Sequence, residues 1–157
     1  MRKQDRAVTD HAQIIEILEN NDVCRVALKD DEGLYIVPLN YGYEFESGNL
    51  YLYLHGAKEG RKVNTFKKGN VEVAFEIDEK NEMKGSGDNA CTYTYLYKSI
   101  IGNGIASVVE GSDNKEKALR LLMFNIIKKD DFKFSKQSID NVLVMKISVT
   151  TFSAKKH

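Results

Sequence analysis

Short segments with strand-like alternation, separated by turn-length polar stretches, constrain the fold of this chain more than any other feature. The clearest is 50–55, which places three leucines on one face and Tyr51, Tyr53 and His55 on the other. Similar strands are predicted over 23–28, 34–43, 71–78, 93–110 and 142–149. The connections around residues 30–33 and 46–49 are short, so their neighbouring strands are expected to pair antiparallel. A closed or nearly closed barrel would protect the edges of so many strands.

About three helices accompany these strands. Residues 10–20 and 113–129 each carry an apolar stripe behind a capping pair, and residues 59–68 predict a short basic helix closed by a glycine. The segment 79–90 is polar and predicts a loop, and Cys91 is expected in the core. The predicted fold class is therefore α+β, an antiparallel barrel with flanking helices, in one domain that spans all 157 residues.

Charge and cysteine content argue against several classes of protein. The 23 Lys and Arg residues equal the 23 Asp and Glu residues, so there is no basic excess of the kind that nucleic acid or an anionic membrane requires. No apolar run approaches the roughly 20 residues of a membrane helix, and the charged N-terminus has no hydrophobic segment behind it. Cys24 and Cys91 form no Cys-x-x-Cys pattern, so no disulfide or zinc framework is expected and the cytoplasm is the expected location.

The segment HGAKEGRK, which begins at His55, is the most informative motif. A strand ends at His55, and Gly56 and Ala57 are small enough for a ligand to approach the backbone. Arg61 and Lys62 then open a helix, and two cations beside the free N–H groups of a helix start suit a phosphate. A solvated loop with ordinary surface cations is the alternative, and the motif alone does not decide between them.

A proline within a strand is the second feature. Pro38 lies in the segment VPLNY, residues 37–41, and cannot donate to a β-ladder, so it marks a strand edge or a bulge. The neighbouring amides are then free to bond something else, such as the polar edge of a planar ring. Alternatively, the proline only discourages aggregation at an edge strand.

The third feature is the segment YKSIIGNG, residues 97–104. Its Lys98 amine and Ser99 hydroxyl could hold phosphate oxygens, and Gly102 and Gly104 permit close approach. The Gly-x-Gly is not a dinucleotide-binding fingerprint, because no strand–turn–helix pattern surrounds it.

His55 is the candidate acid–base residue, although a haem ligand and a stacking partner are also open interpretations. No second histidine lies near it in the sequence, and no cysteine lies at a recognisable spacing. Neither a metal site nor a nucleophilic triad is therefore expected. His11 and His157 are expected at the surface.

In their order and spacing, these three segments together resemble the pyridoxamine 5′-phosphate oxidase-like split barrels, and within them the 5-nitroimidazole resistance (Nim) branch. The similarity runs from Arg6 to the Ala-Lys-Lys before the C-terminal histidine. It implies an FMN-binding split β-barrel with Greek-key-like connections. It also implies a homodimer that holds FMN non-covalently in a cleft between its two subunits.

The resemblance assigns roles to single residues. Those expected to face the FMN phosphate are Arg61, Lys62, Lys98 and Ser99. Those expected along or near the isoalloxazine ring are Pro38, Leu39, Asn40, Tyr41, His55, Gly56 and Ala57. His55 matches the histidine of the Nim motif on the substrate side, so it is the expected catalytic residue.

Two functions of different classes follow. The first is an FMN-dependent oxidoreductase that reduces a small molecule such as a nitroimidazole or nitroaromatic compound, with His55 or a water as the proton source. The second is a non-catalytic flavin- or haem-binding protein, in which His55 could be an axial haem ligand. A barrel without cofactor that serves as an interaction module is a third. The C-terminus has no arginine-containing substrate motif of the classical oxidases, so vitamin B6 oxidation is not expected.

Overall fold

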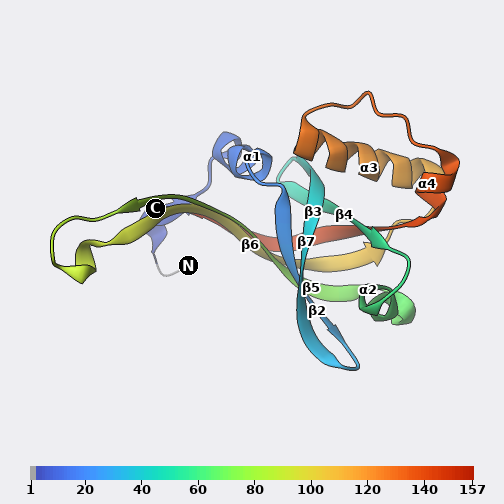
Figure 1. Ribbon diagram of the computed structural model, residues 1–157, viewed down its shortest axis with the longest axis horizontal. Coiled ribbons are helices and arrows are strands. Elements are labelled where there is room, and N and C mark those ends of the chain that lie inside the picture. The colour runs from blue at the N-terminus through green and yellow to red at the C-terminus, as the bar shows by residue number, and fades with distance from the viewer. Residues whose placement is uncertain (1–2) are drawn as a thin grey trace.

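The computed structural model describes residues 3–157, except for the side chains of residues 80 and 81 (Figure 1). The strands are β1 (Ala7–Val8), β2 (Val23–Asp30), β3 (Gly33–Glu46), β4 (Asn49–Ala57), β5 (Val71–Lys84), β6 (Thr94–Val108) and β7 (Val142–Lys156). The α-helices are α1 (His11–Glu19), α2 (Arg61–Thr65), α3 (Ser112–Ile127) and α4 (Lys136–Asp140). Short 3₁₀ turns follow at η1 (Gln4–Arg6), η2 (Phe66–Lys68) and η3 (Ala90–Thr92).

The strands form one antiparallel sheet that closes on itself. Its order is β1-β7-β4-β3-β2-β5-β6, and β6 also pairs with β7, which closes the barrel. Because β4 lies beside β7 and β2 beside β5, the connections are Greek-key-like. The structure confirms the predicted α+β class and antiparallel barrel.

α1 packs its apolar stripe into the barrel core. The Asp10 carboxylate accepts a hydrogen bond from the Gln13 N–H at 3.0 Å, which confirms the predicted N-terminal cap. The buried residues Ile14, Ile17 and Leu18 belong to the same apolar cluster as the inward-facing residues of the strands. α1 and α3 lie on the same side of the barrel (Figure 1).

α3 crosses the barrel at β3 in direct backbone contact. A Cβ placed on Gly42 would lie 2.3 Å from the Leu122 backbone nitrogen, so only glycine permits this approach. Asn125, a polar residue on the apolar face of α3, is buried and donates to the carbonyl oxygens of Asn21 and Tyr41. These two bonds tie α3 both to β3 and to the connection that follows α1.

The segment 79–90 differs most from its prediction. β5 continues to Lys84 and pairs with β6, so the first half of this segment belongs to a hairpin arm that extends from the barrel (Figure 1). The arm carries η3 near its end, where the Asn89 side chain accepts the Cys91 N–H. Cys91 is exposed, so its expected place in the core is wrong.

β7 is also longer than its sequence pattern indicates. Its second half has few buried side chains, but it continues the ladder with β6 to Lys156 and accepts β1 at Ala154 and Lys155. Backbone pairing, which leaves no mark in hydrophobic alternation, extends this strand. β7 therefore runs from the end of β4, with which it pairs at Val142, to the N-terminal strand β1, with which it pairs at Lys155.

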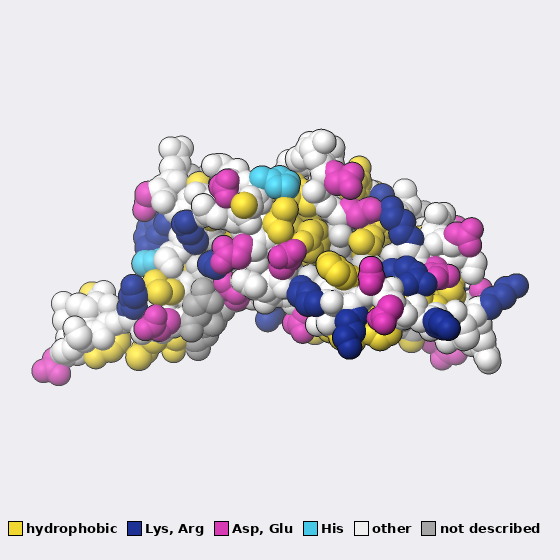
Figure 2. Space-filling view, turned by 90° about the horizontal axis from the view of Figure 1, so that it is seen from above, with side chains coloured by type: hydrophobic (Ala, Val, Ile, Leu, Met, Phe, Trp, Pro, Cys, Tyr) yellow, Lys and Arg dark blue, Asp and Glu magenta, His cyan; other side chains and the backbone are white. Residues whose placement is uncertain are grey.

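The surface seen from above mixes both signs of charge (Figure 2). Lysines, arginines and carboxylates are interspersed on this face and do not gather into a patch of one sign. Among the helices described, none has the length and apolar content needed to cross a membrane.

Candidate functional site

The barrel is split between β3 and β4. The two strands pair only from Tyr41 and Leu54 to their connecting turn. Before Tyr41, β3 pairs with β2, whereas beyond Leu54, β4 pairs with β7. Residues 33–40 and 55–57 are thus two backbone edges with no ladder between them. The two motifs that begin near Pro38 and His55 lie on these opposite edges.

The structure confirms that Pro38 marks a strand edge. Pro38 lies opposite Arg25 of β2, and because proline has no N–H, this must be a non-hydrogen-bonded pair. Hydrogen-bonded and non-hydrogen-bonded pairs alternate, so the backbone groups of Ile36 and Asn40 also point away from β2. The edge at the split therefore offers the backbone N–H and C=O groups of Ile36 and Asn40. Between them, Pro38 offers only its C=O group.

His55 presents an unsatisfied polar atom at the other edge. Its Nδ1 is buried and has no hydrogen-bond partner among the described residues. Burial, followed by the charge of Lys62, lowers the pKa of His55 below its ordinary value of 6.5. The imidazole is therefore neutral at neutral pH, and its buried Nδ1 lacks the hydrogen-bond partner that a buried polar atom normally has.

Lys62 lies across the end of β4 because the residue beneath it is a glycine. A Cβ on Gly56 would lie 2.9 Å from the Lys62 Cε and 3.4 Å from its Nζ, closer than ordinary contact. No ion pair holds Lys62 to the other described side chains. Its ammonium is thus an uncompensated positive charge beside the neutral His55.

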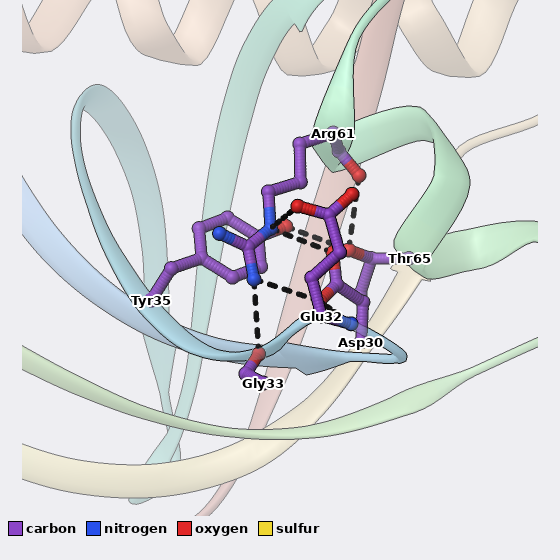
Figure 3. Close-up of polar contacts among 6 residues, drawn as sticks. All are labelled: Asp30, Glu32, Gly33, Tyr35, Arg61 and Thr65. Atoms are coloured by element: carbon purple, nitrogen blue, oxygen red, sulfur yellow. Dashed lines mark hydrogen bonds and ion pairs between the residues drawn. The ribbon is translucent and has the colours of Figure 1, made fainter.

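Arg61 has a different environment, shown in Figure 3. Its Nε and Nη2 donate to the two Asp30 carboxylate oxygens at 2.7 and 2.8 Å, and Nη2 also donates to the Gly33 carbonyl at 3.2 Å. The guanidinium lies 4.0 Å from the centre of the Tyr35 ring. The Tyr35 hydroxyl contacts the Thr65 hydroxyl at 2.6 Å. This cluster joins α2 to the tip of the β2–β3 hairpin.

The remaining residues near the split have varied exposure. Leu39 packs against the core, and Asn40 donates from its side chain to the Asp22 carbonyl. Ala57 is exposed at the end of β4. The Tyr41 side chain is fully buried in the core, where its hydroxyl donates to the Leu18 carbonyl of α1, so its predicted place along the isoalloxazine ring can concern only its backbone.

Lys98 and Ser99 lie at the opposite end of β7 from the split. Ser99 is paired with Lys155 of β7, whereas His55 is paired with Val144. These positions are separated by a strand path of roughly 35 Å, and Figure 1 shows α2 and the C-terminus at opposite ends of the molecule. Lys98 also bonds to Glu16 at 2.6 Å. One chain therefore does not bring Lys62 and Ser99 to the same phosphate.

Sequence reasoning did not find the partners of Arg61. Asp30 falls within the predicted connection at residues 30–33 and Tyr35 within the predicted strand 34–43, and neither pattern indicates a contact with an arginine. The signal available was weak, since Asp30 lies 31 positions before Arg61 and no local spacing connects them. No group of three or more histidine, cysteine or carboxylate side chains is arranged to hold a metal ion within the described part of the chain.

Comparisons with known proteins give a family match for most of the chain. Residues 10–156 match the family model described as pyridoxamine 5′-phosphate oxidase. A comparison with curated proteins found no match.

Several solved structures are similar over nearly the whole chain. A "putative 5-nitroimidazole antibiotic resistance protein" from Bacteroides thetaiotaomicron is 29% identical, with a TM-score of 0.78 over 96% of this chain and 86% of that one. A FAD and heme binding protein from Mycobacterium smegmatis has a TM-score of 0.79 at 16% identity, over 96% of this chain and 73% of that one. The flavocytochrome Anf3 from Azotobacter vinelandii has a TM-score of 0.77 at 15% identity, over 100% of this chain and 72% of that one. The last two similarities concern the fold, whereas the Bacteroides protein supports the predicted Nim branch.

Proposed function

The chain belongs to the pyridoxamine 5′-phosphate oxidase family, and from that premise we propose that it is an FMN-dependent oxidoreductase that reduces a small molecule. A nitroimidazole or other nitroaromatic compound is the proposed acceptor, because the Bacteroides protein is described as a 5-nitroimidazole antibiotic resistance protein. The observation that carries the proposal is the split itself. It places an unsatisfied His55 nitrogen and an uncompensated Lys62 charge beside an unpaired backbone edge.

These groups fit the chemistry of FMN. The backbone edge around Pro38 can meet the polar rim of a flat ring, and Gly56 leaves room at the end of β4 for the Lys62 side chain, with which a Cβ would collide. The Lys62 ammonium suits a phosphate group. FMN bound here, once reduced by an external two-electron donor, would supply the hydride for reduction of the acceptor and return to its oxidised form.

His55 would act as a neutral hydrogen-bonding residue. Its lowered pKa leaves little imidazolium at neutral pH, so any proton that it gives to the acceptor must be replaced at the other ring nitrogen or from water. Its buried Nδ1 would also orient the ring against the ligand.

The proposed site needs a second copy of the chain. Within one chain, Ser99 is too far from Lys62 to contact the same phosphate, so a contribution from Ser99 has to come from a partner. We therefore include the homodimer with FMN between its subunits in the proposal.

An exposed apolar face supports this arrangement. On the outer side of the barrel, Leu34 is 79% exposed, Ile36 69% and Ile101 54%. Alternation along the strands places Pro38 on the same face as Ile36, and Ser99, which is itself buried, on the same side of β6 as Ile101. A second copy that covered this face would bury these side chains and lie between the two halves of the site.

Complementation between two defective variants tests the shared site. Lys62→Glu and Ser99→Asp should each fail to bind FMN as homodimers. Coexpression should restore about a quarter of the sites, because half of randomly formed dimers are mixed and each mixed dimer has one intact site. Recovery of no sites, with mixed dimers present, would contradict the shared site.

A haem-binding protein would instead show a Soret band that disappears in His55→Ala.

A further inference from the structure

Arg61 donates three hydrogen bonds near the proposed site, two to Asp30 and one to the Gly33 carbonyl. Figure 3 shows the Arg61 guanidinium held by both Asp30 oxygens and the Gly33 carbonyl, above the Tyr35 ring. The Asp30 side chain is only 10% exposed. A paired, bidentate geometry of this kind fixes both the position and the orientation of an arginine.

Two carboxylates surround the Arg61 guanidinium in this cluster, so its positive charge is more than neutralised. The hydrogen bonds from Arg61 hold the pKa of Asp30 below its usual value, so Asp30 is ionised at neutral pH. The Glu32 carboxylate lies 3.9 Å from the Arg61 Nε and adds a second negative charge. Arg61 therefore brings no net positive charge to an anion that approaches the split, whereas its neighbour Lys62 does.

The cluster also fixes the start of α2. Arg61 is the first residue of this helix and Thr65 is its last, and Thr65 contacts both the Tyr35 hydroxyl and the Arg61 carbonyl. A helix of five residues has little stability of its own, so tertiary contacts must hold it. Lys62 follows Arg61 directly, and its path across Gly56 depends on where the helix begins.

We propose that Asp30 and Arg61 form a positioning latch, which binds α2 to the β2–β3 hairpin and so places Lys62 for the phosphate. In this account Arg61 is a positioning residue and Lys62 is the phosphate ligand. The inference rests on the proposed FMN site and assigns to Asp30 a part in selecting phosphorylated flavin. It replaces the expectation that Arg61 faces the phosphate directly.

Asp30→Asn separates the latch from direct binding by Arg61, because the two accounts predict opposite results. Breaking the latch should misplace Lys62 and weaken FMN selectively. If Arg61 were itself a phosphate ligand, removing its competing carboxylate would leave FMN binding unchanged or strengthen it. The measurement is the ratio of the dissociation constants for riboflavin and FMN, which differ only by the phosphate.

We expect Asp30→Asn to lower this ratio about tenfold, towards the value for Lys62→Met. Asp31→Asn is the matched control. It removes the same charge from the same turn, but Asp31 bonds to Lys68 of η2 and not to Arg61. Its ratio should stay within about twofold of wild type. A ratio that is unchanged or raised in Asp30→Asn would overturn the latch. This holds even if the variant is less stable than wild type.

Hydrogen–deuterium exchange tests the latch without flavin. The amides of residues 63–66 bond within α2 and its 3₁₀ extension, and they should exchange faster in Asp30→Asn but not in Asp31→Asn. Equal exchange in the two variants would overturn the latch. If the wild-type protein bound no FMN, the proposed function would fail, and the exchange measurement would still decide the latch.

Discussion

Replacing Gly56 with alanine should weaken binding of the FMN phosphate while it leaves the stability of the fold almost unchanged. The new Cβ would lie 2.9 Å from the Lys62 Cε, whereas carbon atoms in contact normally lie about 3.5–4.0 Å apart. The end of the lysine must therefore move by about 1 Å. Because this end is flexible, the free energy of unfolding should fall by less than about 1 kcal/mol.

The same displacement should have a large effect on FMN. A hydrogen bond that involves a charged group contributes about 1.5–3 kcal/mol, so losing it should raise the FMN dissociation constant roughly 10- to 100-fold. Riboflavin has no phosphate, so its affinity should change by less than about twofold. Quenching of flavin fluorescence, as flavin is titrated with apo-protein, measures both constants.

The double variant with Lys62→Met is the control for this reasoning. When Lys62 is already replaced by methionine, Gly56→Ala should cause little further loss of FMN affinity, because both changes remove the same interaction. Unchanged FMN affinity in the single variant would refute the role of Lys62. An equal loss for FMN and riboflavin would show instead that the substitution damages the ring site.

Other predictions concern stability, pH and thiol access. Gly42→Ala should lower the free energy of unfolding by about 2–3 kcal/mol in urea titrations, because its Cβ meets the backbone of α3; a loss below about 0.5 kcal/mol would contradict that contact. Asn125→Ala should cost a similar 2–3 kcal/mol, since the buried Tyr41 carbonyl and the partly buried Asn21 carbonyl both lose their donor. Thermal unfolding would detect this loss, and an unchanged stability would argue against a stabilising role for these two hydrogen bonds. The depressed pKa of His55 makes the unfolded state bind more protons just below pH 6.5, so stability should fall as the pH falls from 6.5 to the folded pKa. His55→Gln should flatten this pH dependence. In the native protein a thiol reagent should label Cys91 but not Cys24, because burial hides the Cys24 thiol and raises its pKa to about 12. Mass spectrometry after digestion measures both, and labelling of Cys24 would contradict its burial.

Local sequence patterns predicted the elements whose causes are local. The alternation of 50–55 identifies β4 because one of its faces lies in the core and the other meets different neighbours. The capping pair at Asp10 identifies the start of α1 because the bond spans only three residues. Pro38 identified a strand edge because the missing N–H excludes one class of ladder position.

Features that depend on distant contacts were missed. The end of β5 carries mostly polar side chains without alternation, so residues 79–84 were predicted as part of a loop although β6 was predicted as a strand, and Cys91 was misplaced in the core. The second half of β7 is held by backbone pairing, which sequence patterns do not reveal.

The candidate site was predicted as separate motifs, but their spatial relation was not. Arg61 and Lys62 are neighbours in the same sequence motif. In the fold, however, Arg61 pairs with Asp30, whereas the charge of Lys62 has no carboxylate partner among the described residues. Only the register of β7 reveals that Ser99 lies far from His55 in the same chain. Such relations depend on pairings between residues dozens of positions apart, which no local spacing encodes.

The visible absorption spectrum of the purified protein, with identification of the chromophore released by heat, tests the central claim most directly. We expect the absorption bands of an oxidised flavin and the release of FMN in a ratio approaching one per chain. A Soret band in their place, or a colourless protein that fails to take up added FMN, would contradict the claim that this split barrel is an FMN site.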